Sequence, residues 1–317
     1  MSHAATLPLF PELPVAGRPS REAIPLRSRS GVDYLDLVTK EILNRVDSPR
    51  LPFQWTINPY RGCEFGCAYC YARDTHSFFE LDASDDFETK IFVKRRAADR
   101  LRRQLAKSDL RGQTIAIGTA TDPYQPAEKQ FEITRSLLEV FDEVDGLALS
   151  ITTKSPLLLR DLELLERLDR RHAVEVHVTI TTVDPALARR LESHAPDPKS
   201  RLHLVERLAE VGIATRVNCM PLMPGINDDE EVLTPLFEAA AKAGAQQITA
   251  NPIFVKGKSR DHFFAWLERE FKELLPLYRH LFAHRDYLDD AARERVLMTF
   301  RRLRLQHGFP RGAAGRV

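Results

Sequence analysis

The sequence has few cysteines and no long apolar run. Only four of its 317 residues are cysteine, and three of these lie within eight positions. A disulfide framework would spread an even number of cysteines along a small secreted chain. The crowding of the cysteines therefore excludes a disulfide framework. The longest run without Asp, Glu, Lys or Arg is residues 243–255. That is shorter than the roughly 20 residues a membrane-spanning helix needs.

The chain also lacks an excess of positive or negative charge. The chain has 46 basic and 45 acidic residues, a net charge of +1, so its bulk charge favours no particular partner. The N-terminus lacks a basic segment followed by an apolar one, so we expect no secretory signal. Together with the crowded thiols, this predicts a cytoplasmic protein that keeps its cysteines reduced and has no membrane partner.

The chain divides into three parts. Residues 1–50 are predicted to be a mobile Pro-, Arg- and Ser-rich tail followed by a short amphipathic helix over residues 32–46. Residues 51–256 alternate short apolar runs with longer helix-like stretches. Residues 257–317 follow a helical pattern, with Pro276 as a predicted kink or break, and form a helical C-terminal extension.

Six strand-like runs define the middle part, and stretches of helical periodicity follow them. The predicted strands are residues 53–58, 114–118, 147–152, 174–180, 213–219 and 247–250; the predicted helices are residues 91–105, 131–141, 156–168, 199–211 and 232–242. Repeated strand–helix units predict a parallel sheet with helices outside it, either doubly wound or an incomplete (β/α)8 barrel. In both folds ligands bind at the carboxyl ends of the strands, where polar residues follow each run.

Three cysteines follow the first predicted strand with the spacing Cys-x3-Cys-x2-Cys: Cys63, Cys67 and Cys70. Structural zinc normally takes four protein ligands, and no second Cys/His pair has zinc-finger spacing. Three thiolates instead suit an iron–sulfur cluster with one iron left open, a variation on the usual four-thiolate ligation.

The cysteine loop, with Tyr69 before its last cysteine, resembles the signature of the radical S-adenosylmethionine (SAM) superfamily. Three further segments resemble its spore photoproduct lyase-like branch, often labelled "DNA repair photolyase": TATDPYQPAE at 119–128, TTKS at 152–155 and PLMPGIND at 221–228. The resemblance runs from about Ile42 to Asn251. It implies an α/β fold, a partial (β/α)6 TIM-like barrel of the radical SAM type. It also implies an enzyme whose [4Fe-4S] cluster, held by Cys63, Cys67 and Cys70, cleaves SAM reductively to a 5′-deoxyadenosyl radical that abstracts hydrogen from a substrate.

The resemblance also implies residues that contact SAM, and we expect them at the strand ends. These are Lys154, Thr121, Asp122, Thr179, Thr181 and Asn218, with Arg201 and Arg216 as weaker candidates. Two positions depart from the family pattern. Glu192-Ser193 stands where relatives often have Glu-Pro, so no role is carried over to Glu192. Thr119 stands where spore photoproduct lyases place a hydrogen-donating cysteine, and a hydroxyl cannot replace a thiol in that reaction.

Several alternatives stay open. Cys219 is either a small core residue or a redox or hydrogen-donor thiol. Basic stretches at residues 94–111 and 293–316 are either solvated helix faces or a contact for nucleic acid, whose repair or modification is an alternative function. A third alternative is a non-catalytic iron–sulfur or zinc protein with a binding or regulatory role. The radical SAM enzyme that the resemblance implies would instead require an external one-electron donor, such as a flavodoxin- or ferredoxin-like protein.

Overall fold

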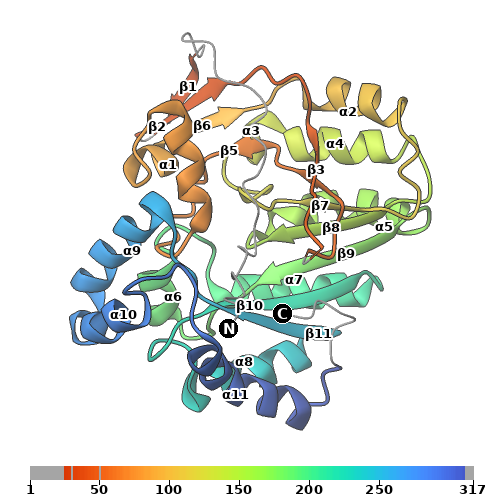
Figure 1. Ribbon diagram of the computed structural model, residues 1–317. Helices are drawn as coiled ribbons and strands as arrows, with labels where there is room; N and C mark the ends of the chain where they lie inside the picture. The colour runs from red at the N-terminus through yellow and green to blue at the C-terminus, as the bar shows by residue number, and fades with distance from the viewer. Residues whose placement is uncertain (1–24, 30, 50, 311–317) are drawn as a thin grey trace, which may run out of the picture.

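The computed structural model describes residues 25–29, 31–49 and 51–310. Its main sheet has the order β11-β10-β9-β8-β7-β4-β3. Six neighbouring strands are parallel: β4 (Trp55–Ile57), β7 (Thr114–Ile117), β8 (Ala148–Thr153), β9 (Ala173–Thr179), β10 (Ala214–Leu222) and β11 (Gln247–Pro252). The short β3 (Leu43–Arg45) pairs antiparallel with β4 at one edge. The predicted set of six parallel strands is therefore confirmed (Figure 1).

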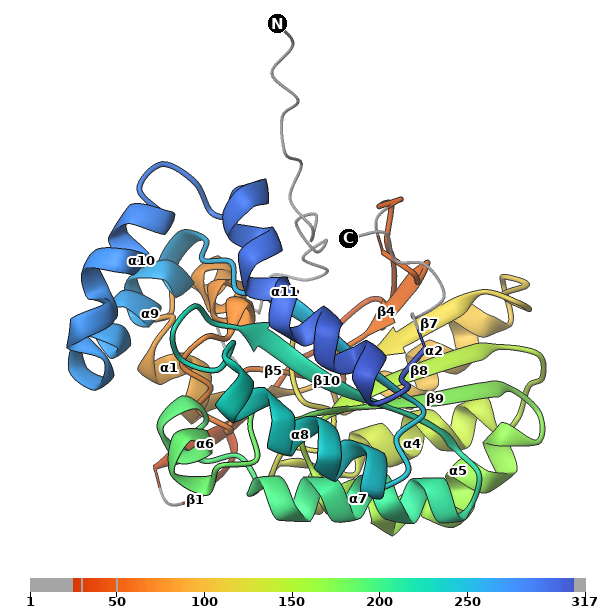
Figure 2. The same cartoon turned by 90° about the horizontal axis from the view of Figure 1, so that it is seen from below.

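Helices cover the outer side of this sheet. They are α2 (Ala97–Leu105), α4 (Ile133–Phe141), the 3-10 helix η2 (Pro156–Asp161), α5 (Leu162–Asp169), α7 (Pro198–Glu210) and α8 (Glu230–Lys242). Two short helices, α3 (Glu128–Phe131) and α6 (Pro185–Leu191), follow β7 and β9 in the chain, and the leucines of α6 belong to a separate apolar cluster. Figure 2 shows α4, α5, α7 and α8 along one side of the strands. Asp184, Asp197 and Asp229 cap three of the helices, each accepting a hydrogen bond from a backbone amide of the first turn.

Alternating side chains explain why the inner side of the sheet is polar. In β8, Leu149 and Ile151 are buried against the helices, whereas Ser150 and Thr152 are half-buried. A strand turns successive side chains to opposite faces, so the second pair lies on the inner side. The strands thus bury one apolar face under the helices and leave a polar inner face for a ligand.

A second, four-stranded sheet has the order β1-β2-β6-β5 (Figure 1). It lies beside the edge of the main sheet that β3 and β4 form. It contains β1 (Pro25–Arg29), β2 (Val32–Asp36), β5 (Tyr60–Arg61) and β6 (Lys90–Val93). The predicted helix over residues 32–46 is therefore wrong, because this segment forms β2 and β3. The first residues of the predicted helix 91–105 are also strand, and α2 starts only at Ala97. Most of the predicted mobile tail lies outside the described residues, although residues 25–29 form β1.

Helices follow the last strand, as expected: α9 (Gly257–Glu270), the 3-10 helix η3 (Lys272–Leu274), α10 (Leu275–Leu281) and α11 (Asp290–Gln306). The break comes at Phe271 rather than at Pro276, which lies in the first turn of α10. Residues of α9 and α10 form a separate apolar cluster, and α11 packs against α8 and β11. No helix among the described residues has the length and apolar character needed to span a membrane.

Candidate functional site

The three clustered cysteines lie on the loop between β5 and the 3-10 helix η1 (Tyr71–Phe79). All three thiols are free; Cys63 and Cys67 are buried, and Cys70 is half-buried. The loop is pinned on one side by the Cys63 amide, which donates to Phe87 O at 2.9 Å. Gly62 allows this approach, because a Cβ added at its φ of +85° would lie 2.9 Å from the same oxygen.

A second pinning point joins the loop to the segment after α6. Cys67 forms an isolated antiparallel bridge with Glu192. The Ala68 amide donates to Leu191 O at 3.0 Å, and the His194 amide donates to Phe65 O at 3.1 Å. Two chain segments more than 120 residues apart in sequence therefore hold one another in place.

Arg73 supports the loop from inside. Its side chain is almost fully buried and donates twice to Cys67 O, at 3.2 and 3.0 Å. It also donates to Ser84 O at 2.9 Å and forms an ion pair with Glu88. The sequence analysis assigned Arg73 no role, although it lies only three residues after Cys70.

The thiols share one electrostatic environment. Burial raises the pKa of Cys63, and the nearby Asp122 and Cys67 raise it further, while hydrogen bonds from the Phe65 and Asp122 amides oppose the rise. Burial raises the pKa of Cys67 to about 12, with Glu192 and Cys70 adding to the rise and the Lys154 ammonium opposing it. Because thiolates are the metal-binding form, metal would have to displace these protons.

Lys154 lies beside this loop, at the end of β8. Its ammonium is 5.8 Å from the centroid of the Tyr69 ring. Burial lowers the pKa of Lys154, but the nearby Cys67 and Glu192 outweigh burial and raise it above its usual value. The side chain is half-buried and keeps a positive charge next to the thiols.

Glu192 occupies the centre of a buried polar network next to Lys154. It accepts hydrogen bonds from the hydroxyls of Tyr69 and Thr181 and forms an ion pair with Arg201. Burial favours its neutral form, but Arg201 and Lys154 hold the pKa of Glu192 below its usual range. The sequence prediction that left Glu192 without a role is therefore corrected, because this carboxylate joins the cysteine loop to the ends of β8 and β9.

Thr121 and Asp122 follow β7 and use their hydrogen bonds within the protein. The Thr121 hydroxyl donates to Gly62 O at 2.6 Å and accepts from Gln125 at 2.9 Å. Asp122 is buried and accepts from the Thr153 hydroxyl and the Lys154 amide, both at 2.7 Å. These two predicted residues therefore lie at the site and fix the loop and the position of Lys154.

The remaining predicted residues lie on β9, directly after it, on α7 and on β10. Thr179 and Thr181 are buried, and Arg201 donates to Thr179 O at 3.1 Å. Asn218 Oδ1 accepts from the Thr249 hydroxyl at 2.7 Å on the inner side of the sheet. Arg216, by contrast, forms an ion pair with Glu175 on β9, within the sheet rather than beyond its strand ends.

Cys219 lies apart from the other cysteines. It is fully buried in the main apolar core, and its sulfur contacts only Thr181 O, at 3.9 Å, among the hydrogen-bonding groups of the described residues. Burial raises its thiol pKa. These contacts favour the core-residue alternative over the redox or hydrogen-donor alternative.

The site residues fit an iron–sulfur cluster. Three unbridged thiols lie on one short loop, amides donate toward Cys63, and a lysine balances the charge near Cys67. Hydrogen bonds to sulfur and nearby charge are the features by which proteins adjust the reduction potential of such clusters. In the part of the chain that the structure describes, no three His, Cys, Asp or Glu side chains surround a single point as ligands of one metal ion.

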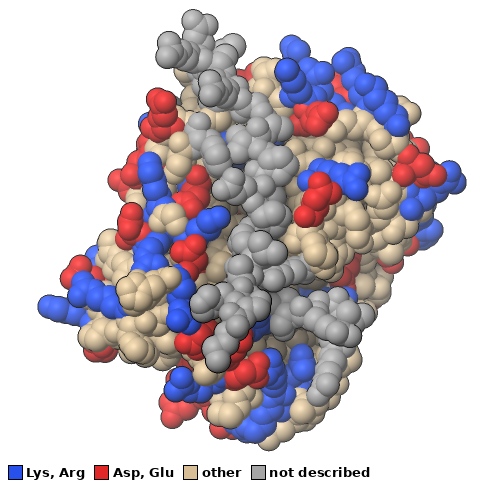
Figure 3. All heavy atoms as spheres, viewed as in Figure 1, with Lys and Arg blue, Asp and Glu red and all other residues tan. Residues whose placement is uncertain are grey.

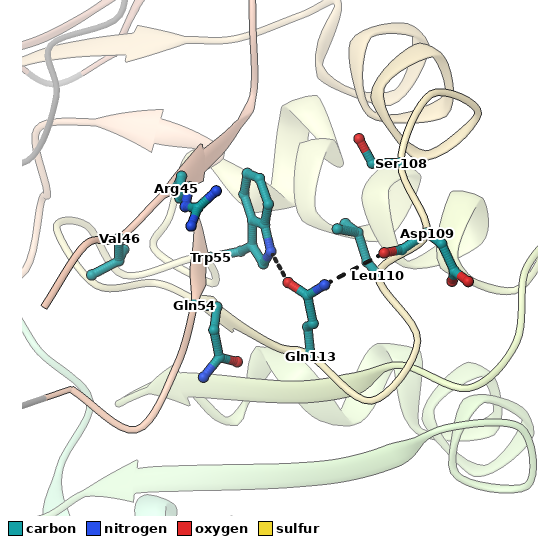
Figure 4. Close-up of a pocket in the computed structure, with 8 residues that line it drawn as sticks. All are labelled: Arg45, Val46, Gln54, Trp55, Ser108, Asp109, Leu110 and Gln113. Atoms are coloured by element: carbon teal, nitrogen blue, oxygen red, sulfur yellow. Dashed lines mark hydrogen bonds between the residues drawn. The ribbon is translucent and has the colours of Figure 1, made fainter. Parts of the chain in front are cut away.

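A separate hollow of about 380 Å³ lies at the opposite end of the strands (Figure 4). Trp55 and Gln113, at the starts of β4 and β7, line it and share a hydrogen bond of 2.7 Å. Asp109 and Arg45 lie at its rim, and both pair with charged neighbours in sequence. It is distant from the carboxyl ends of the strands and contains none of the predicted site residues.

Comparisons with known proteins agree with this geometry. The family model of the Radical SAM superfamily matches residues 57–234. An uncharacterized protein of Mycobacterium tuberculosis is 36% identical over 265 residues, which cover 83% of this chain and 78% of that protein. An uncharacterized protein of Methanocaldococcus jannaschii is 26% identical over 264 residues, covering 82% of this chain and 92% of that protein.

Solved structures of spore photoproduct lyase share the fold. One variant superposes with a TM-score of 0.65 at 15% identity, covering 86% of this chain and 79% of that chain. Another, solved with bound AdoMet and dinucleoside spore photoproduct, gives a TM-score of 0.65 at 14% identity over the same shares. The predicted partial barrel and the prediction of an enzyme are confirmed, and the chain belongs to the Radical SAM superfamily.

Proposed function

We propose that Cys63, Cys67 and Cys70 bind a [4Fe-4S] cluster and that the enzyme cleaves SAM to start a radical reaction on its substrate. When bound, the cluster and SAM supply a 5′-deoxyadenosyl radical that abstracts hydrogen. One observation carries the proposal: three free thiols lie on one loop beside the Lys154 ammonium, at the carboxyl ends of the parallel strands.

The protein's own residues would position SAM. Lys154 offers a half-buried ammonium to the SAM carboxylate or a ribose oxygen. The Asn218 amide nitrogen has no hydrogen-bond partner among the described residues, since only its oxygen is used, and it would donate to the nucleoside part. Thr179 and Thr181 line the same end of β9. Thr121 and Asp122 would act by holding the loop and Lys154 in place.

Anaerobic reconstitution tests the proposal. The protein would be supplied with iron and sulfide and reduced, and its iron content, EPR signal and 5′-deoxyadenosine formation measured with SAM. We expect about four irons per chain, a change in the EPR signal on adding SAM, and product. The variants Cys63→Ala, Cys67→Ala and Cys70→Ala should lose all three readouts, whereas Cys219→Ala should keep them.

Each failure has a distinct meaning. A chain that binds no iron and sulfide would overturn the proposal. A cluster whose EPR signal ignores SAM would contradict the roles of Lys154 and Asn218. A signal that responds to SAM without product would instead point to a missing substrate or to the missing one-electron donor, for which a flavodoxin- or ferredoxin-like protein is expected.

A nucleic-acid lesion is the second candidate substrate. The favouring observation is the shared fold with a spore photoproduct lyase solved with a dinucleoside photoproduct. Thr119 argues against the same reaction, because its hydroxyl cannot donate hydrogen as a thiol does. If SAM cleavage increases with an irradiated oligonucleotide, but not with the same oligonucleotide before irradiation, this candidate is supported; an equal rate with both would remove it.

A further inference from the structure

Two cations lie on the same face of the small β5–β6 ladder. Arg61 stands opposite Phe92 in this antiparallel pair. The Lys94 amide donates to Pro59 O at 3.3 Å, which extends the ladder by one pair. Because side chains alternate along a strand, Arg61, Phe92 and Lys94 share a face. Long side chains at diagonal positions on such a face can reach one another, so the charged ends of Arg61 and Lys94 can contact the same small ligand.

Lys94 is buried, and its ammonium has fewer hydrogen-bond acceptors than it has protons to donate. Its residue is 9% exposed, and its ammonium donates to Asn58 O at 2.6 Å. An ammonium has three protons to donate, and no other acceptor for Lys94 is present among the described residues. Lys94, the first residue of the basic stretch 94–111, therefore does not lie on a solvated helix face.

Arg61 also lacks an acidic partner. Its guanidinium lies 4.4 Å from the centroid of the Phe79 ring and donates to Thr75 O at 3.4 Å. Throughout the described ranges, no carboxylate lies within ion-pair distance of Arg61 or Lys94. Burial lowers the pKa of Arg61 to about 10, and burial together with Arg61 lowers the pKa of Lys94 to about 7.

Lys94 is buried and Arg61 is half-buried, whereas the fully buried arginines of the described residues have carboxylate partners. Arg73 forms an ion pair with Glu88, and Arg201 forms one with Glu192. Buried charges are normally paired in this way, because an uncompensated charge away from water is costly. Arg61 and Lys94 are adjacent and like-charged, so a bound anion would relieve both the missing counter-charge and their mutual repulsion.

The position of the pair connects it to the site. Asn58, whose carbonyl accepts from Lys94, lies directly after β4, and its side chain contacts Thr119 and Ala120 after β7. Arg61 precedes Cys63 by two residues. We propose that Arg61 and Lys94 bind an oxyanion group of the substrate, a phosphate or a carboxylate, beside the cysteine loop. The assignment to a substrate rests on the proposed function, whereas the anion site itself does not.

The test measures anion binding without turnover. Lysines of the reconstituted, SAM-loaded protein would be methylated with ¹³C, which keeps their charge, and the Lys94 signal identified by its loss in Lys94→Arg. Inorganic phosphate and acetate are the probes, with chloride at equal ionic strength. We expect one of the two probes to move the titration of Lys94 to higher pH by about one unit. Exposed Lys107 provides the unmoved control signal in the same spectrum.

The outcomes distinguish a phosphate from a carboxylate ligand and show which results would overturn the site. A stronger response to phosphate assigns a phosphate group, and a stronger response to acetate assigns a carboxylate. Arg61→Gln should weaken the response about tenfold. The same titration on the reconstituted protein without SAM separates two cases. A Lys94 signal that ignores both anions with and without SAM overturns the site, and a response seen only without SAM assigns the pair to the cofactor instead. Anion binding without SAM cleavage would contradict only the proposed function.

Discussion

At the scale of single residues, Glu192 illustrates how a buried charge becomes part of a site. The Glu192–Arg201 pair is almost fully buried, and Tyr69 adds a hydrogen bond to the same carboxylate. Removing one partner of such a pair leaves the other charge uncompensated, which costs more than the pair contributes. The network therefore constrains Tyr69, a neighbour of two cysteines, through a residue far away in the sequence.

Replacing Glu192 by Gln should destabilise the protein by about 3 kcal/mol, because Arg201 would lose its counter-charge while staying buried. Urea unfolding under reducing conditions measures this. Glu163→Gln is the matched control: Glu163 is exposed and should change the stability by less than about 0.5 kcal/mol. Equal effects of the two substitutions would contradict the role given to the ion pair.

His76 should make the stability depend on pH. It is fully buried, its Nε2 lies 3.1 Å from Lys90 O, and burial lowers its pKa to about 4, with Arg61 and Arg73 adding to the effect. The unfolded chain binds the proton near pH 6.5, so stability from the neutral ring is lost as the pH falls from about 6.5 toward 4.

In His76→Gln, the loss of unfolding free energy between pH 7.5 and pH 5 should be smaller by about 2 kcal/mol than in the native protein. Urea unfolding at the two pH values checks this. His203→Gln, at a side chain 58% exposed, should leave the pH dependence as it is. A native-like loss in His76→Gln would show that another group titrates.

The cysteines could be proposed as a site from sequence because three rare residues lie close together, a pattern that does not depend on the fold. Glu192 and Arg73 could not be identified in the same way. The contacts of Glu192 are with Tyr69, Lys154 and Arg201, which come from three separate segments. A carboxylate gains such a role only from the fold, and its local sequence resembles that of any exposed glutamate.

At the scale of elements, the segment over residues 32–46 shows where periodicity fails. Its apolar residues are spaced closely enough to suggest a helix, yet Val32–Asp36 pairs with β1 and with β6, so that Asp33 stands opposite Lys90. Pairing between residues far apart in sequence decided the structure here, and a local pattern does not contain that information.

Gly62 sets the geometry of the cysteine loop. Gly62→Ala should destabilise the protein and lower iron incorporation, because the new Cβ would meet Phe87 O and Lys90 O at 2.9 and 3.0 Å in addition to the strain of its positive φ. Gly112→Ala is the matched control, with a φ of +73° and nothing within 4 Å. It should cost only about 1–2 kcal/mol.

Thermal unfolding and iron content after reconstitution measure both variants. If Gly62→Ala lost no more stability than Gly112→Ala and bound iron normally, the close approach of the loop to residues 87–90 would not be needed.

At the scale of the whole molecule, the parallel sheet explains why the site could be located from sequence. All six strands end at the same edge, so polar residues after separate strands meet there. This predicted that Thr121, Lys154 and Thr181 lie near the cysteines. Which of them point toward a ligand, and which support a neighbour, depends on individual hydrogen bonds that strand order does not specify.

The surface charge predicts weak attraction to nucleic acid in general. Figure 3 shows Lys and Arg interleaved with Asp and Glu, with a group of basic residues over α2. In that group Arg102 pairs with Glu143, and on α11 Arg302 pairs with Glu230. We therefore expect random duplex DNA to bind more weakly than about 10⁻⁴ M at 150 mM salt, the weak end of the non-specific range.

Fluorescence anisotropy with a labelled random duplex measures this affinity. Micromolar binding at 150 mM salt that is lost in a double variant, Arg95→Gln with Arg96→Gln, would contradict the prediction and make the exposed start of α2 a nucleic-acid contact.

The bridge between Cys67 and Glu192 would couple the proposed metal loading to local order. Residues 65–68 cannot be fixed without also fixing residues 191–194, since the two segments share their backbone hydrogen bonds. The proposed cluster would thus rigidify the turn over residues 191–194, and by reciprocity a ligand that orders this turn would raise the affinity for the cluster. Amide exchange around His194 would then report whether the cysteine loop is loaded.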